Sequence, residues 1–202
     1  MRYFLIILAI CGIILTGCGG QKPEVQTPQA SVKKNITTNQ TDTMTKKILQ
    51  LQVPAYENKG QMPVKFATKT GGGQNLSPEV RWQTLPAAQS YALLFDDKHP
   101  IANNWVHWLV VDIPNTTTNI PEGTSRTNMP SGSKELQTSW GRTGYDGPQP
   151  PVGSGNHEYV MTLYALDIAS LNMPEDATKS EFLKATQPHI IAQESWSGYF
   201  SR

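Results

Sequence analysis

The sequence predicts a mainly β fold: an antiparallel two-sheet β-sandwich with a few short helices. Several apolar runs have the length of strands, and two of them place apolar residues at every second position. Long stretches rich in Gly, Pro and Asn separate these runs, and only one segment has the start and stop signals of a helix. Hydrophobic residues make up 38% of the 202 residues, which is enough for one domain with a core.

Three predicted strands lie within residues 48–113. An apolar stretch at 48–53 is closed by Pro54, and a Gly-rich loop follows at 71–75. A compact apolar run covers 91–95 and has the length of a strand. In the third run, 105–113, every second residue is expected to point to the same face. Those residues are Trp105, His107, Leu109, Val111 and Ile113.

The second half adds a strand, a helix and a last strand. In the run 159–166, Tyr159, Met161, Leu163 and Ala165 are expected to share one face. Thr178 and Glu181 have the spacing of a capping box, which predicts a helix that ends at Pro188. Residues 189–193 are expected to form the final strand.

The N-terminus resembles the signal of a bacterial lipoprotein. An arginine and a short apolar run precede Leu15-Thr16-Gly17-Cys18, a pattern in which small residues stand before a cysteine that becomes acylated. The run is too short to span a bilayer comfortably as a permanent helix. We therefore expect residues 1–17 to be a signal peptide and Cys18 to carry lipid, including palmitate. The alternative is an ordinary signal peptide with a cysteine at this place by chance.

Residues 18–45 are expected to form the lipidated cysteine and a flexible tether, and residues 46–202 the folded domain. The tether is polar and has no hydrophobic periodicity, so it cannot bury enough apolar area to offset its ordering entropy. Acyl chains on Cys18 would anchor the protein in the membrane of the bacterial cell envelope. Gly19 after the cysteine favours the outer membrane in a Gram-negative organism.

Composition argues against several classes of function. The net charge is +1 and no basic patch stands out, so nucleic-acid binding is not expected. The two cysteines, Cys11 and Cys18, both precede the domain, which therefore carries no disulfide and no thiolate metal site. We expect no metal, no cofactor and no enzymatic activity. A homodimer is compatible with these data.

Four polar positions of the predicted strands are candidate ligand-binding residues. His157 and Tyr159 are two apart in a strand and face the same side, next to a glycine-rich loop. His107 lies within an apolar strand, and Asp96 stands at the end of another. Strand ends and loop mouths are common places for ligand-binding groups.

Four segments around these residues resemble the phosphatidylethanolamine-binding protein (Raf-kinase-inhibitor-like) family. They are FDDKHP at 95–100, WVHW at 105–108, GYDGPQPPVG at 144–153 and HEY at 157–159. Further matches are NLSP at 75–78 with Trp82, LYAL at 163–166 and the Gly198-Tyr199 pair. The resemblance covers roughly residues 48–202. It implies a large antiparallel sheet packed on a smaller one and a small pocket for phosphate-like anions.

Carried over position by position, the resemblance implies a defined pocket. Its residues are Asp96, Pro100, Trp105, His107, His157 and Tyr159, with Tyr145 near the rim. The implied partners are a small anionic ligand, a phospholipid headgroup or a phosphorylated protein in the envelope. Two positions depart from the family pattern, because Lys98 stands where a second acid is usual and Glu158 where an arginine is usual. If Lys98 points inward, the rim becomes more attractive to anions.

Other interpretations of the same residues stay open. Taken alone, His107 on an apolar strand is more often a core histidine than a ligand, and we expect His99 to be exposed and His189 to be structural. Two histidines with one aspartate could bind a metal, although no short histidine spacing is present. The alternative functions are a protease or kinase inhibitor acting through its surface, and a hydrolase using His157 with Asp96, for which the sequence identifies no nucleophile.

Overall fold

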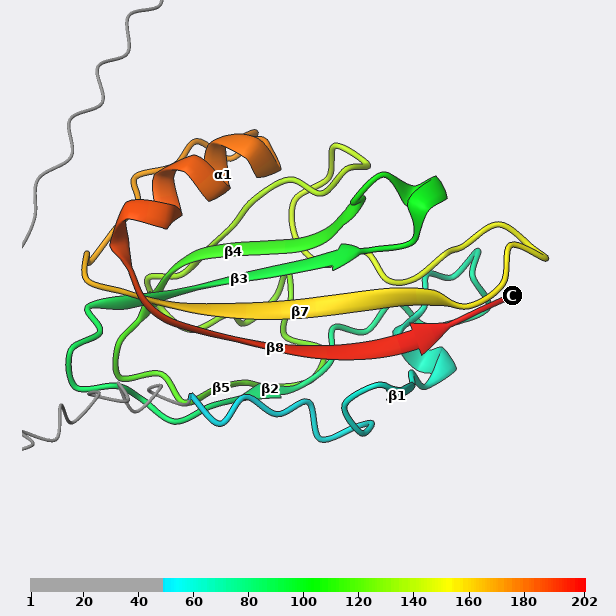
Figure 1. The fold of residues 1–202 in the computed structure, drawn as a ribbon, viewed down its shortest axis with the longest axis horizontal. Helices are drawn as coiled ribbons and strands as arrows, with labels where there is room; N and C mark the ends of the chain where they lie inside the picture. Colours follow the sequence, from blue (N-terminus) through cyan, green and yellow to red (C-terminus); the bar gives the residue numbers. More distant parts are fainter. Residues whose placement is uncertain (1–48) are drawn as a thin grey trace, which may run out of the picture. The chain divides into compact units, whose positions relative to one another are not determined.

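A computed structural model of the chain describes residues 49–202 (Figure 1). The predicted signal peptide, Cys18 and the tether lie outside the described residues. The described part is mainly β, with two sheets and a few short helices, so the predicted fold class is confirmed. Figure 1 shows α1 on one side of the large sheet and the short strands β2 and β5 on the other.

The large sheet has six strands in the order β1-β8-β7-β3-β4-β6. Its four long strands are β3 (Ser90–Asp97), β4 (Val106–Pro114), β7 (His157–Leu166) and β8 (Ile190–Phe200). The edges are the two-residue strands β1 (Gly60–Gln61) and β6 (Lys134–Glu135). All pairs are antiparallel except β1 with β8, which is parallel. The final strand is longer than the predicted 189–193.

The small sheet pairs β2 (Val80–Arg81) with β5 (Asn119–Ile120). The segment predicted as a strand at 48–53 adds only one isolated bridge, between Gln52 and Arg81. Its apolar residues Leu49, Leu51 and Val53 are buried. A longer ladder does not form here because Gln50 has a φ of 50°, which is left-handed rather than extended.

Within residues 49–202 the one α-helix is α1 (Lys179–Thr186), and its capping box is present as predicted. The Thr178 hydroxyl accepts from the Glu181 amide, and the Glu181 carboxylate accepts from the Thr178 amide. The helix ends at Thr186, just before the predicted end at Pro188, which lies in a short 3₁₀ helix, η3 (Gln187–His189). Two more 3₁₀ helices are η1 (Val64–Phe66) and η2 (Pro100–Ala102).

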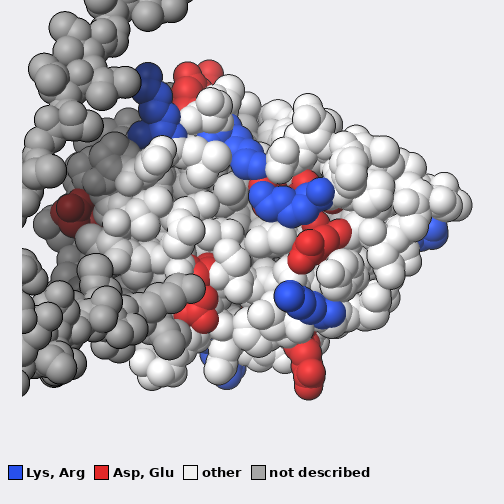
Figure 2. Space-filling model, in the orientation of Figure 1, with Lys and Arg blue, Asp and Glu red and all other residues white. Residues whose placement is uncertain are grey.

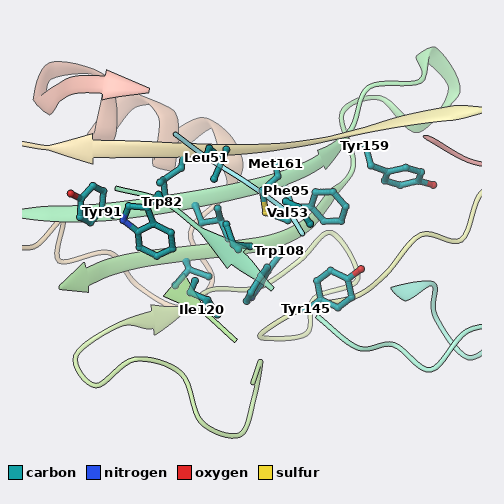
Figure 3. Close-up of a cluster of buried hydrophobic side chains, with 14 of the residues drawn as sticks. Leu51, Val53, Trp82, Tyr91, Phe95, Trp108, Ile120, Tyr145, Tyr159 and Met161 are labelled. Atoms are coloured by element: carbon teal, nitrogen blue, oxygen red, sulfur yellow. The ribbon is translucent and has the colours of Figure 1, made fainter. Parts of the chain in front are cut away.

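Two apolar clusters stabilise these layers. The larger cluster fills the space between the two sheets and includes Phe95, Trp108 and Tyr145, each with no exposed surface. The smaller cluster packs Phe182 of α1 against the other face of the large sheet. Figure 3 shows Tyr145 and Tyr159 at one end of the larger cluster, far from Tyr91. This end of the core is where the candidate site lies.

Two bulges interrupt the pairing of β3 with β4, and Asp112, with a φ of 57°, lies at one of them. Each bulge inserts a residue and shifts the alternation of side chains. As a result, the consecutive residues His107 and Trp108 lie on the same side of the sheet, while Leu109 packs under α1. His107 lies on the Trp108 side, with its ring 5.1 Å from that of Tyr159. The prediction that alternate residues of 105–113 share one face is therefore wrong.

The surface carries charges of both signs. On the face drawn in Figure 2, lysine and arginine side chains lie next to aspartate and glutamate side chains. Within residues 49–202, no helix has the length and hydrophobicity needed to cross a bilayer.

Candidate functional site

A cavity of about 240 Å³ opens at one end of the large sheet. Its walls come from the ends of β3, β4 and β7, from η2, and from the loop before β7. The lining residues are Asp97, Ile101, Ala102, Trp105, His107, Trp140, Gln149, Pro150, Pro151, His157 and Tyr159. Of the seven predicted pocket residues, four line this cavity, namely Trp105, His107, His157 and Tyr159.

Asp96 is not a pocket residue, because it faces the opposite side of the sheet. Its carboxylate accepts from Lys98, at 2.6 Å, and from Lys179 of α1. Consecutive strand residues point to opposite faces, so it is Asp97 that shares the face of Phe95 and reaches the cavity. Lys98 is held on the α1 side and does not line the cavity, and neither does Glu158.

Pro100 and Tyr145 also lie outside the cavity lining. Pro100 is exposed and begins η2, where its fixed φ suits the first helical position. The next two residues, Ile101 and Ala102, line the cavity in its place. Tyr145 is completely buried in the core rather than at the rim. Its hydroxyl donates to the Phe66 carbonyl at 2.9 Å, which satisfies it internally.

His157 is held between two polar partners. Its Nδ1 lies 2.6 Å from Asp97 Oδ2, and its Nε2 lies 3.0 Å from the Ser154 hydroxyl. The other Asp97 oxygen accepts from the backbone amide of His99 at 2.8 Å. A carboxylate at this distance requires a proton on Nδ1, so the tautomer is fixed. The ring of His99 stacks on that of His157 at 3.9 Å, so His99 is half-buried rather than exposed as expected.

His107 has one tautomer at neutral charge. Its Nδ1 lies 2.7 Å from the Asp146 carbonyl and 3.2 Å from the Gly147 carbonyl, and both are acceptors. Nδ1 must therefore carry the proton, which leaves Nε2 as an acceptor. Burial lowers the pKa of His107 below the ordinary histidine value. His107 is therefore a neutral acceptor near pH 7.

Tyr159 supplies an unpaired hydroxyl. The side chain has no exposed surface, and among the described residues its oxygen has no hydrogen-bond partner. Burial, and then the neighbouring Asp97 carboxylate, raise the pKa of this hydroxyl, so it stays protonated and can donate. An unpaired buried hydroxyl costs free energy, and such groups in native proteins require an explanation.

Aromatic rings close the sides of the cavity. Trp105 and Trp140 meet edge to face with their centroids 5.2 Å apart, and Trp140 also contacts the His107 ring. Gln149 adds a polar wall: its carbonyl oxygen accepts from the Thr68 hydroxyl at 2.7 Å, which leaves its amide NH₂ group to donate. The cavity thus combines a few polar groups with apolar walls, as small-ligand sites usually do.

The positive charge near the cavity lies outside it. No lysine or arginine is among the lining residues. An adjoining hollow, which shares Trp140 and Gln149, is lined by Lys69, Arg126 and Arg142. Both arginines pair with the one carboxylate of Asp146, so the hollow keeps a net positive charge. Small anions that approach the cavity from this side are therefore attracted.

Comparison with known proteins identifies the family. The model for phosphatidylethanolamine-binding protein matches residues 52–201. The chain belongs to the phosphatidylethanolamine-binding protein family. Its fold resembles that of a solved phosphatidylethanolamine-binding protein homologue from Chlamydia trachomatis, with a TM-score of 0.67 and 27% identity over 77% of this chain and 98% of that one. Escherichia coli YbcL, with a TM-score of 0.71 and 23% identity over 76% and 98%, shares the fold.

Two sequence relatives match this chain over most of their own length. The UPF0098 protein of Methanothermobacter thermautotrophicus is 33% identical over 156 residues, which is 76% of this chain and 99% of that protein. The Mycobacterium tuberculosis protein named "Putative lipoprotein LppC" is 31% identical over 189 residues, which is 93% of this chain and 90% of that protein. The family resemblance of the sequence motifs is thus confirmed.

The sequence analysis did not predict several residues that line the cavity of this protein. Gln149, Pro150 and Pro151 lie within the quoted segment at 144–153, so that segment could have identified them. Trp140 stands in a loop with no periodicity, and its place in the chain carries no such signal.

A metal centre of the kind considered above does not assemble. His107 turns its Nδ1 to backbone carbonyls, His157 turns its Nδ1 to Asp97, and Asp96 faces away. Among residues 49–202, no three His, Cys, Asp or Glu side chains are grouped so that they could hold a metal ion.

Proposed function

We propose that the cavity binds a singly charged, phosphate-like anion, carried by a lipid headgroup or by a free phosphodiester, and that lipid on Cys18 holds the domain at the cell envelope. One observation carries the binding proposal: the Tyr159 hydroxyl is buried and unpaired in a cavity of the size of a small ligand. A ligand oxygen at this place would satisfy it.

The other polar groups favour a monoanion. Tyr159 and the Gln149 amide are neutral donors, and the charge of Asp97 is countered by His157 when that ring is protonated. The bare Nε2 of His107 accepts, so it suits a ligand that also carries one proton or an ammonium group. A phosphate dianion would find too few donors and would face both Asp97 and a bare nitrogen. A phosphodiester has one negative charge and fits this set better.

The open cavity supports binding over a purely surface-mediated inhibitor. If the pocket were a relic, the protein's own side chains would be expected to fill it, whereas about 240 Å³ is open between polar groups and tryptophan rings. The membrane part of the proposal has separate support. The segment Leu15-Thr16-Gly17-Cys18 has the pattern of a lipoprotein signal, and the relative named as a lipoprotein matches 93% of this chain.

The binding proposal is tested by isothermal titration of the full-length protein in a maltoside detergent. The probes are sn-glycero-3-phosphoethanolamine, inorganic phosphate, and a mixture of glycerol and ethanolamine. Binding of the phosphodiester, weaker binding of phosphate above pH 7 and no binding of the mixture are expected. Vesicles with and without phosphatidylethanolamine, tested by flotation, then separate a lipid-borne source from a free one. If neither the phosphodiester nor phosphate binds, the proposal is wrong.

Matched histidine variants show where binding occurs. His157→Asn removes the ring between Asp97 and Ser154. His189→Asn removes a histidine that also pairs with an aspartate, Asp167 at 2.8 Å, but does not line the cavity. We expect the first variant to lose binding and the second to keep it. Equal affinities would place the ligand elsewhere.

A further inference from the structure

Ser154, His157 and Asp97 form a hydrogen-bonded relay, and the anion-binding proposal uses His157 and Asp97 but not Ser154. The Ser154 Oγ lies 3.0 Å from His157 Nε2, and His157 Nδ1 lies 2.6 Å from Asp97 Oδ2. His157 and Asp97 are 1% and 3% exposed, whereas Ser154 is partly accessible. The carboxylate is itself oriented by the His99 amide. These are the contacts of an activated serine nucleophile, with its base and with the acid that orients the base.

The ordinary role of Ser154 is to close a turn, and the chain contains a second copy of that turn. In Pro151-Val152-Gly153-Ser154, the serine hydroxyl donates to the Pro151 carbonyl at 2.6 Å. In residues 130–133, Ser133 makes the same bond to the Pro130 carbonyl, also at 2.6 Å. Among the described residues, Ser133 makes no hydrogen bond to a histidine. The turn thus explains the bond to proline but not the contact with His157.

The proton positions allow Ser154 to act as a nucleophile. Because Nδ1 carries a proton toward Asp97, a neutral His157 has a bare Nε2, and the Ser154 hydroxyl can donate to it. In the protonated state, Nε2 donates to Ser154 instead, and the serine proton turns to the Pro151 carbonyl. The hydroxyl therefore has a partner in both states of the base, and it rotates between them as the base gains or loses a proton.

We propose that this protein is also an ester hydrolase in which Ser154 is the nucleophile, His157 the general base and Asp97 the residue that orients His157. The substrate class is esters of short acyl chains, because the adjoining cavity has walls of Trp105 and Trp140 and a volume of about 240 Å³. Asp97 and His157 line the cavity of the binding function, and Ser154 contacts His157 from outside that lining. The proposal shares this cavity but does not require a phosphate ligand.

The reaction balances with water as the only co-substrate. Ser154 Oγ attacks the ester carbonyl carbon while its proton passes to His157 Nε2. The bond to the leaving alcohol then breaks, and the alcohol takes that proton. Water attacks the acyl-serine, gives a proton to His157, and the acid leaves as Ser154 regains the proton.

The test is covalent labelling of the purified full-length protein with an alkyl fluorophosphonate. Ser154 would displace fluoride and gain one phosphonyl group, which intact-mass and peptide mass spectrometry locate. Labelling at Ser154 is expected in the wild type and in Ser133→Ala, and it should be absent in Ser154→Ala. Because both substitutions remove the same turn hydrogen bond, equal melting temperatures of the two variants show that loss of labelling is not loss of folding.

Hydrolysis of p-nitrophenyl acetate gives the second measurement. We expect Ser154→Ala and His157→Asn each to lower the rate by about 100-fold or more, and Ser133→Ala to leave it unchanged. Ser154→Ala should still bind sn-glycero-3-phosphoethanolamine, which separates this activity from the binding function. The hydrolase proposal is overturned if the wild type is not labelled, or if Ser154→Ala hydrolyses the ester as fast as the wild type.

Discussion

Replacing Tyr159 with phenylalanine removes one buried oxygen that has no partner among the described residues. A buried hydroxyl without a hydrogen bond costs about 1–3 kcal/mol relative to water. Tyr159→Phe should therefore raise the free energy of unfolding of the ligand-free protein by about 1 kcal/mol. For a domain of this size, that is an increase of about 2–4 °C in melting temperature. A water molecule bonded to the hydroxyl would reduce the gain toward zero, but it would not reverse its sign.

Tyr56→Phe is the matched control for this substitution. The Tyr56 side chain is 8% exposed, and its hydroxyl is also buried and unpaired among the described residues, but it does not line the cavity. Both variants should thus be at least as stable as the wild type. Only Tyr159→Phe should lose affinity for the phosphodiester, by about tenfold for a lost bond to a charged oxygen.

The assay is thermal unfolding of the ligand-free protein together with isothermal titration of sn-glycero-3-phosphoethanolamine. A gain in stability combined with a loss of binding is typical of a group that is kept for its ligand. If Tyr159→Phe instead lowers the melting temperature by several degrees, the hydroxyl makes a stabilising hydrogen bond. In that case the argument for the anion site loses its main support.

Four further predictions concern the histidine, the helix and the anchor. Burial lowers the pKa of His107, so its contribution to stability is present above the unfolded value of about 6.5 and is lost as pH falls below it. His107→Asn should flatten the fall in unfolding free energy between pH 7 and pH 5, and an unchanged pH profile would contradict this. Thr178→Ala removes the capping box of α1 and should cost about 1 kcal/mol in chemical denaturation, whereas no change would show that packing alone holds the helix. Deleting residues 19–45 should shift the melting temperature by no more than about 2 °C, and a larger fall would mean that the segment packs on the domain. Cys18→Ser should leave the precursor uncut or release the protein from the membrane fraction, and wild-type partitioning would refute the anchor.

The sequence predicted the fold well because two signals agree over long segments. Period-two apolar positions and turn residues mark β7, whose buried face includes Tyr159, Met161 and Leu163 as expected. The capping box at Thr178 predicted the first residue of α1 correctly. These signals are local, so one chain is enough to detect them.

The site was predicted less completely because it depends on long-range pairing. Asp97 rather than Asp96 reaches the cavity, and that choice depends on which face of β3 joins the larger cluster. His107 is turned toward Tyr159 beside a bulge that no residue pattern marks. Ser154 meets His157 only through a turn whose geometry resembles that of an ordinary serine turn elsewhere in the chain.

The position of a bound phosphodiester is the most direct test of the proposed binding function. A crystal structure of the full-length protein soaked with sn-glycero-3-phosphoethanolamine would show it. We predict that a phosphate oxygen lies at hydrogen-bonding distance, about 2.7 Å, from the Tyr159 hydroxyl, with the Gln149 amide as a second donor. A phosphate bound outside the cavity between His107, His157 and Tyr159, while this cavity stays unoccupied, would contradict the proposed function.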